Sequence, residues 1–130
     1  MSDEKSGEEM YGEAYKESNE PIFSGVPTFL KLPEVDRDQL SEEDVDIGII
    51  GAPLDTATTI RPGTRYGPRA VRAASTVPSP PYEHFNIETG VDPFDTFKVA
   101  DTGDAAVSPG DTRQSQLNIE DAVAEISEQA

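Results

Sequence analysis

The sequence predicts an α/β protein built on a short parallel sheet that this stretch of chain leaves unfinished. Two segments are typical of strands, 45–53 (VDIGIIGAP) and 96–101 (TFKVAD), and each is followed by a loop and then by a helical pattern. Alternation of strands and helices favours parallel strands joined by crossover helices. Because no strand follows the last helical segment, we expect an incomplete sheet.

Length and composition indicate one domain. The 130 residues suffice for a modest core, and residues 1–20, with seven acids and no apolar periodicity, are predicted to be a disordered acidic tail before a domain at 21–130. The chain has no cysteine, no apolar run of about 18 residues and no basic and apolar leader. We therefore expect a soluble, cytoplasmic protein.

The charge balance restricts the class of partner. The chain carries 26 acidic and 10 basic residues, for a net charge of −16. Nucleic acids and anionic membranes need a basic face, so neither is expected as a partner. This balance suits a halophilic cytosol, where salt screens the self-repulsion, while an ordinary acidic mesophile protein is the alternative.

The first half of the domain contains an arm, a strand and a helix. Residues 21–33 (PIFSGVPTFLKLP) combine apolar side chains with three prolines, which predicts an extended arm that packs without joining the sheet centrally. Residues 34–44 favour a short helical turn or a loop. The β-branched run at 45–53 is typical of a strand buried on both faces. Pro68 suits the first position of a helix, and we expect four small residues to lie on the sheet: Ala70, Val71, Ala73 and Ala74.

The second half contains a long loop, a strand and a final helix. Residues 77–95 are rich in proline and turn residues, and loops of that length are usually functional or packed against a neighbouring subunit. The strand at 96–101 is followed by an exit loop at 101–111. In the final segment Ile119, Val123 and Ile126 have the spacing of one helix face, with Glu120, Asp121 and Glu125 expected to face water.

Few residues offer catalytic chemistry. His84 is the only histidine, and a single histidine in a proline-rich loop is usually a surface or packing residue. Asp101 and Asp104 come at the carboxyl end of a strand, where open α/β sheets bind ligands. A pair of carboxylates could hold a hard cation or divide the roles of general acid and general base. The alternative that we favour is structural: Asp101 accepts hydrogen bonds from loop N–H groups and Gly103 supplies the turn.

Four of the six arginines fall between Arg61 and Arg72 in an otherwise anionic chain. They could hold a phosphate or carboxylate at a helix N-terminus, although no glycine-rich nucleotide motif accompanies them. They could instead form one wall of a substrate cleft. The interpretation best supported by composition is that Arg61 and Arg65 pair with acids of this chain or of a neighbouring subunit and hold the loop in place.

Segment 51–75 (GAPLDTATTIRPGTRYGPRAVRAAS) closely resembles the N-terminal signature of agmatinase-type ureohydrolases of the arginase superfamily. The resemblance continues in 23–33 and in 90–111 (GVDPFDTFKVADTGDAAVSPGD), so it covers roughly residues 21–128. It implies the three-layer α/β/α parallel sheet of the arginase type. Here that sheet is expected to be incomplete.

The resemblance also implies a chemistry. Such enzymes hydrolyse a guanidino group to urea and an amine, with two Mn²⁺ ions (sometimes nickel) that bridge a hydroxide. Their partners are cationic guanidino compounds, and they form homo-oligomers of the trimer or hexamer type. An anionic protein would attract such a cation.

The metal ligands of the family lie in Gly-Gly-Asp-His, Asp-Ala-His-x-Asp and Ser-x-Asp-x-Asp segments beyond the part seen here. No catalytic or metal-binding residue carries over, and no metal is expected on this chain alone. What carries over is the loop at the active-site mouth or at subunit contacts, with candidate residues Asp55, Thr56, Arg61 and Arg65.

Three hypotheses follow. The chain is the N-terminal portion of an agmatinase-like amidinohydrolase, inactive alone, whose remaining C-terminal portion or oligomeric partners complete it. It could instead be a non-catalytic module that docks on a full-length ureohydrolase subunit through 21–33 and 77–95, or a small anion-binding domain. Two strands with open edges are marginal alone, so poor solubility or association is expected without a partner.

Overall fold

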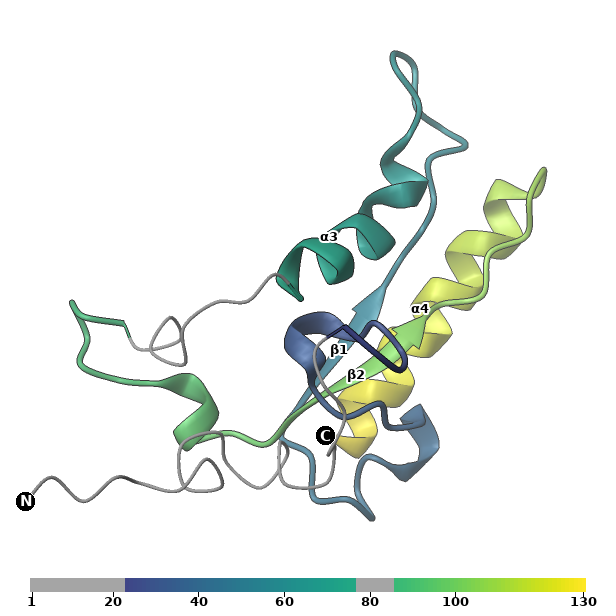
Figure 1. Ribbon diagram of the computed structural model, residues 1–130. Helices are drawn as coiled ribbons and strands as arrows, with labels where there is room; N and C mark the ends of the chain where they lie inside the picture. Colours follow the sequence, from purple (N-terminus) through teal and green to yellow (C-terminus); the bar gives the residue numbers. More distant parts are fainter. Residues whose placement is uncertain (1–22, 77–85) are drawn as a thin grey trace, which may run out of the picture.

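The computed structural model describes residues 23–76 and 86–130 (Figure 1). The regular elements alternate as predicted, in the order β1 (Ile47–Gly51), α3 (Gly67–Ser75), β2 (Val99–Asp104) and α4 (Thr112–Gln129). Single 3₁₀ turns lie in the connections: η1 (Phe29–Lys31), η2 (Arg37–Gln39), η3 (Thr64–Tyr66) and η4 (Pro93–Asp95). The predicted tail at 1–20, His84 and residues 77–85 of the predicted loop at 77–95 lie outside the described residues.

The two strands pair in parallel, with Ile49 of β1 opposite Asp101 of β2. Two residues further along β1, Gly51 lies opposite Asp104, so β2 holds one extra residue over this stretch. The extra residue makes a bulge, and Gly103 has a φ of 72°, which favours glycine. The predicted strand at 96–101 is therefore shifted: it begins at Val99 and continues through the bulge to Asp104.

The arm closes the outer edge of β2. The amide of Asp101 donates to Pro33 O over 2.9 Å, and the amide of Val35 donates to Asp101 O over 3.0 Å. This agrees with an arm that packs beside the sheet without entering its centre. The other edge of the sheet belongs to β1, and no described segment pairs with it. The expectation that β1 is buried on both faces holds only in part: Gly51 is buried and the three residues before it are partly buried, but Ile47 at the start of the strand is exposed.

The helices α3 and α4 cover opposite faces of the strands (Figure 1). A Cβ atom on Gly48 would lie 2.9 Å from Ile126 of α4, whereas one on Gly51 would lie 2.8 Å from Pro68 of α3. Residues an odd number of positions apart on a strand point to opposite faces. The three-layer α/β/α arrangement is therefore confirmed.

The apolar core lies on the α4 face. Leu40, Val45, Ala100 and Ile126 form one buried cluster, with Leu40 completely covered. The helix begins at Thr112 because Asp111 caps it, accepting from the Gln114 amide over 2.9 Å.

The buried face of α4 differs in part from the prediction. Its buried residues are Ser115, Ala122 and Ile126, so Val123 is exposed instead of facing the sheet. Glu125, expected to face water, forms a half-exposed ion pair with Arg37 at 3.1 Å.

The orientation of α3 also corrects the prediction. The four small residues expected on the sheet (Ala70, Val71, Ala73 and Ala74) are all exposed, and we call them the Ala–Val face of α3. The helix instead turns Pro68, Arg72 and Ser75 toward the sheet. The cause is the ion pairs of Arg72, which fix the rotation of the helix.

Candidate functional site

The loop after β1 is organised around Asp55. Its carboxylate accepts from the Gly63 amide at 2.7 Å, from the Arg65 amide at 3.3 Å and from Arg65 Nε at 2.6 Å. The side chain of Asp55 is covered by this loop, while Arg65 is half exposed. The expected pairing of Arg65 with an acid of the same chain is therefore confirmed, and it fixes the shape of residues 55–65.

Opposing effects act on the Asp55 carboxyl. Its covering by the loop raises the pKa, but the hydrogen bonds from Arg65 and Gly63 and the charge of Arg65 outweigh that effect. The pKa of Asp55 therefore lies below its usual value, and the carboxylate stays charged at neutral pH.

The other two candidates in this loop have different surroundings. Thr56 Oγ1 lies 2.6 Å from Thr112 Oγ1, a hydrogen bond that connects the loop to the start of α4. Arg61 is exposed with a φ of 55°, uncommon for a residue with a side chain, and it forms no ion pair with the part of the chain that the structure describes. The predicted acidic partner of Arg61 is thus not found there.

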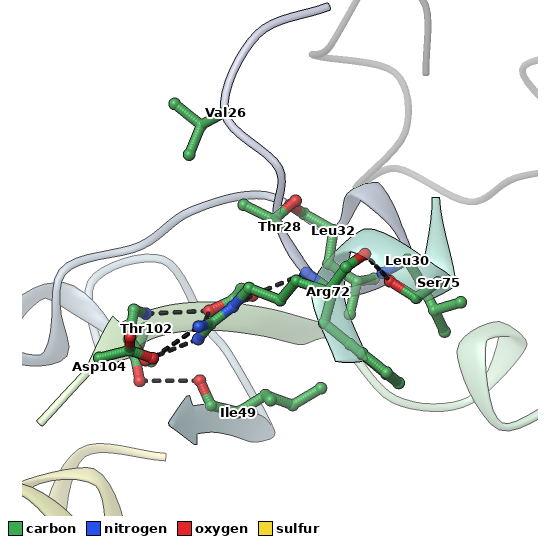
Figure 2. Close-up of polar contacts among 12 residues, drawn as sticks. Val26, Thr28, Leu30, Leu32, Ile49, Arg72, Ser75, Thr102 and Asp104 are labelled. Carbon is green, nitrogen blue, oxygen red and sulfur yellow. Dashed lines mark hydrogen bonds and ion pairs between the residues drawn. The ribbon is translucent and has the colours of Figure 1, made fainter. Parts of the chain in front are cut away.

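Arg72 forms the densest polar cluster in the described ranges, at the carboxyl end of the sheet (Figure 2). Its Nε and Nη2 donate to the two oxygens of Asp101 at 2.8 and 2.9 Å. Nη1 donates to Asp104 Oδ1 at 2.5 Å, and Nη2 also donates to Gly103 O at 2.8 Å. One guanidinium thus connects α3 to three residues of β2, and we call this group the Arg72 cluster.

The bulge in β2 makes this arrangement possible. Asp101 and Asp104 are three positions apart, so in a regular strand their side chains would point to opposite faces. The extra residue brings both carboxylates to the α3 face, where Arg72 lies between them. Gly51 provides the space, because a Cβ atom there would collide with the Asp104 carboxylate.

The arm also reaches the cluster. The Phe29 amide donates to Asp101 Oδ2 at 2.7 Å. The Leu30 amide donates to Ser75 Oγ at 2.8 Å, and Ser75 Oγ donates to Arg72 O at 2.7 Å (Figure 2). Leu30, with a φ of 52°, is therefore held in a left-handed conformation by contacts to α3.

Burial alone would raise the pKa of Asp101, but the hydrogen bonds from Arg72, Phe29 and Gly103 hold it below its usual value. The hydrogen bond to Asp101 is the main reason that the pKa of Arg72 is raised. Asp101 also accepts from the Gly103 amide at 2.9 Å. The structural interpretation of Asp101 and Gly103 was therefore right, although the sequence reasoning missed Arg72 and Phe29 as partners.

The donor set of the Arg72 cluster does not suit a metal ion. Within 23–76 and 86–130, no three His, Cys, Asp or Glu side chains converge. The positive guanidinium of Arg72 already lies between the two carboxylates that the sequence offered for a cation. The signal that could have revealed this role is an arginine on the helix after β1 together with two aspartates at the end of the neighbouring strand.

These features define an α/β protein of the three-layer, parallel-sheet class, with its polar cluster at the carboxyl edge of the strands. The sequence profile described as the arginase family matches residues 45–130. This chain belongs to the arginase family.

The most informative relatives act on guanidino compounds by name. The chain is 41% identical over 88 residues to the guanidinobutyrase of Pseudomonas aeruginosa, covering 68% of this chain and 26% of that protein. It is 43% identical over 84 residues to the mitochondrial agmatinase of Gallus gallus, covering 65% of this chain and 22% of the relative. The chain thus spans about a quarter of the length of these curated relatives.

Solved structures agree on the fold. A hypothetical agmatinase from Burkholderia thailandensis superposes with a TM-score of 0.69 at 33% identity, over 92% of this chain and 34% of that one. The proclavaminate amidino hydrolase of Streptomyces clavuligerus gives a TM-score of 0.69 at 29% identity, over 85% and 34% of the two chains. In the described parts of this chain, no helix has the length and apolar character that a membrane span requires.

Proposed function

We propose that this chain is the N-terminal part of an amidinohydrolase that converts a guanidino compound and water into urea and an amine. The observation that carries the proposal is the family match over residues 45–130, together with relatives named guanidinobutyrase, agmatinase and guanidinopropionase. Their names differ in the chain attached to the guanidino group. We therefore propose a guanidino compound as the substrate class, with the attached chain left open.

The described residues have a positioning role in this proposal. The Asp55–Arg65 contacts give the loop after β1 a fixed shape, with Thr56 and Arg61 on it, and we assign this loop to the mouth of the site or to a subunit contact. The net charge of −16 favours approach of a cationic guanidino compound. A cytoplasmic homo-oligomer is part of the same proposal.

Two Mn²⁺ ions are implied by the family and would supply the activated water when bound. The described residues do not fit these ions, because the guanidinium of Arg72 already occupies the space between the carboxylates of Asp101 and Asp104 and pairs with both. The manganese ligands of the proposed enzyme would come from outside residues 23–76 and 86–130.

The test is urea release by a chimera in which residues 1–130 replace the matching segment of the Pseudomonas aeruginosa guanidinobutyrase. With Mn²⁺, we expect urea from the chimera and from the parent guanidinobutyrase, and none from the 130-residue chain alone. A chimera that has the circular dichroism and the mass of the parent but releases no urea from guanidinobutyrate or agmatine would count against the proposal.

A second candidate is a non-catalytic module that docks on a full-length ureohydrolase subunit. The exposed Ala–Val face of α3 favours it, because an apolar helix face usually packs against another element. Co-purification of the chain with an intact ureohydrolase from its source, without urea release from the chimera, would select this candidate. The anion-binding candidate has less support, because Arg65 and Arg72 are already engaged by carboxylates.

A further inference from the structure

The loop that follows β1, residues 52–66, connects the two helix layers at the carboxyl end of the sheet. It leads from β1 into α3, which covers one face of the strands, whereas α4 covers the other (Figure 1). Near the beginning of the loop, however, Thr56 Oγ1 lies 2.6 Å from Oγ1 of Thr112, the first residue of α4. The loop therefore contacts the helix of one layer before it enters the helix of the other.

Different contacts set the shape of this loop and its position. The carboxylate of Asp55 accepts from the amides of Gly63 and Arg65 and from Arg65 Nε, and all three donors belong to the loop itself. They fix its internal shape but not its distance from α4. The hydrogen bond between Thr56 and Thr112 joins the loop to α4, so this bond sets where a loop of fixed shape lies at the end of the sheet.

The start of α4 is a firm point of attachment. Ser115, one turn into the helix, is fully buried, and its Oγ accepts from the Ser108 amide at 2.9 Å. Further along the helix, Asn118 Nδ2 donates to Ala106 O at 3.1 Å. Both bonds connect α4 to the loop that leaves β2. Thr112 therefore brings the exit loop of β1 together with the exit loop of β2.

The bond between Thr56 and Thr112 matters more for position than for folding. Thr56 is exposed, so water can replace its partner, and a neutral hydrogen bond of this kind adds little net stability. Ligands of open α/β sheets bind at the carboxyl ends of the strands, and a small displacement of the groups around a substrate has a large effect there. The same loop carries Arg61 and Arg65, so its position decides where their side chains lie.

We propose that Thr112 is a positioning residue of the substrate site: through Thr56 it holds the loop of Asp55 and Arg65 at the mouth. This inference rests on the proposed function, since the substrate is the guanidino compound assigned there. Thr112 does not touch the substrate in this role. Loss of its hydroxyl should weaken the binding of the substrate and of the transition state alike, which raises KM and leaves kcat nearly unchanged.

Kinetics of the chimera described above test this role. Thr112→Val keeps the shape of the side chain without its hydroxyl, and we expect it to raise the KM for guanidinobutyrate about two- to tenfold, as loss of one neutral hydrogen bond does, with kcat changed by less than about twofold. Thr112→Ser keeps the hydroxyl and should restore the KM of the unsubstituted chimera. A Thr112→Val chimera with an unchanged KM would overturn the role.

A double-mutant cycle shows whether Thr112 acts through Thr56. Thr56→Val should raise KM by the same factor as Thr112→Val, and the double variant should raise it no further, because the two changes remove one bond. Thr89→Val is the matched control, since Thr89 is exposed and precedes β2, on the amino side of that strand, and its KM should equal that of the unsubstituted chimera. Factors that multiply in the double variant would mean that Thr112 does not act through Thr56.

A cysteine pair tests the contact without any activity. The chain has no cysteine, so Thr56→Cys with Thr112→Cys allows one intramolecular disulfide in the chain alone. The two Oγ1 atoms are 2.6 Å apart, which suits the approach of two sulfur atoms, and we expect diamide to remove both free thiols from the monomer. Thr89→Cys with Thr112→Cys is the control and should keep both thiols. A pair at 56 and 112 that keeps its thiols would contradict the contact.

The outcomes separate this inference from the proposed function. Urea release with the same KM in every variant would leave the function standing and overturn the role of Thr112. A folded, unsubstituted chimera that releases no urea would reject the function and, with it, that role, even where the cysteine pair forms. In an active chimera the oxidised pair should keep the KM of the unsubstituted protein. Loss of urea release on oxidation, reversed by reduction and absent from Thr56→Cys alone, would mean that the loop leaves α4 during turnover, which contradicts a fixed position.

Discussion

The two faces of the sheet are attached to their helices by different forces. On the α4 face, Ala100 packs with Leu40, Val45 and Ile126 in an apolar cluster. On the α3 face, the adjacent residue Asp101 is held by Arg72, with almost no apolar burial by the helix itself. The strand β2 thus presents an apolar face to α4 and a charged face to α3. Apolar side chains of α4 pack on the first face, and Arg72 of α3 pairs with the second.

The difference explains why α3 exposes its Ala–Val face. Burial of aliphatic side chains has no preferred direction, whereas an arginine that binds a carboxylate through two nitrogens fixes both distance and rotation. The Arg72 cluster therefore fixes the rotation of α3 and leaves its Ala–Val face available for another element. On the other face of the sheet, by contrast, α4 buries Ala122 and Ile126.

Removing the guanidinium of Arg72 should give the largest loss in the free energy of unfolding. Arg72→Met leaves the buried Asp101 without its partner, and loss of one member of a buried pair costs about 3–5 kcal/mol. The free energy of unfolding, from urea titrations followed by circular dichroism, measures this change. Arg69→Met on the same helix is the control, because Arg69 is exposed and has no ion pair with the described residues. Equal effects of the two substitutions would rule out a special role for Arg72.

Shortening a side chain of the apolar cluster should lower the free energy of unfolding by about as much as Arg72→Met, or slightly less. Leu40 is fully buried, and Leu40→Ala is expected to lower the free energy of unfolding by about 2–5 kcal/mol through lost burial and a cavity. Leu117→Ala, on the exposed surface of α4, should change it little. Measurements at 1 M NaCl separate the apolar face from the charged one, because the effect of Leu40→Ala should persist or grow with salt. A Leu40→Ala effect that salt removes would contradict an apolar origin.

A glycine pair probes the space between the sheet and α3. Gly51→Ala places a methyl group against Asp104 and Pro68, so the Arg72 cluster has to shift, at a cost of about 1–3 kcal/mol. Gly67→Ala meets no atom within 4 Å and should be nearly neutral or slightly stabilising. Thermal midpoints of the two variants provide the comparison. A Gly51→Ala midpoint equal to that of Gly67→Ala would show that the space is not needed.

The sequence predicted the elements better than their orientation. Hydrophobic pattern and the Gly67-Pro68 start signal were enough to place β1, α3 and α4, because these depend on local chemistry. The rotation of α3 depends on the pairing of Arg72 with Asp101, which lie 29 positions apart in the sequence. The second contact, between Arg72 and Asp104, also depends on the bulge at Gly103, because the bulge brings Asp104 to the same face as Asp101. Neither the bulge nor the pairing has a local sequence signature.

The site candidates divide in the same way. Asp55 and Arg65 lie ten positions apart, and their pairing follows from a loop held by its own residues. The roles expected of Arg61 and Thr56 at a mouth or a subunit contact depend on elements beyond the described residues, so they stay predictions. The chemistry of the family entered through the resemblance of segment 51–75, since the composition alone left several classes open.

Acid should weaken the charged face and spare the apolar one. The pKa of Asp101 in the folded chain lies below the value of 3.8 for an unperturbed aspartate, so its contribution to stability is complete above about pH 4 and is lost as the pH falls through the folded pKa. In Arg72→Met the guanidinium no longer lowers the pKa of Asp101, so that pKa should rise relative to the unsubstituted chain, although the hydrogen bonds from Phe29 and Gly103 remain. The stability deficit of Arg72→Met should therefore shrink as the pH falls from 7 to 3, while that of Leu40→Ala stays constant. Parallel pH profiles for all three proteins would contradict this.

The smallest effect is expected from the one ion pair in the described ranges that joins α4 to the segment before β1. Arg37 Nε lies 3.1 Å from Glu125 Oε2, with both side chains partly exposed. Pairs of this kind contribute about 0.2–1 kcal/mol and are screened by salt. Arg37→Gln should thus lower the free energy of unfolding slightly at low ionic strength and leave it unchanged at 1 M NaCl, with Arg113→Gln as the control for lost positive charge. A cost near that of Arg72→Met would mean that charge also holds the α4 face, because the apolar cluster would then be too weak to attach the helix by itself.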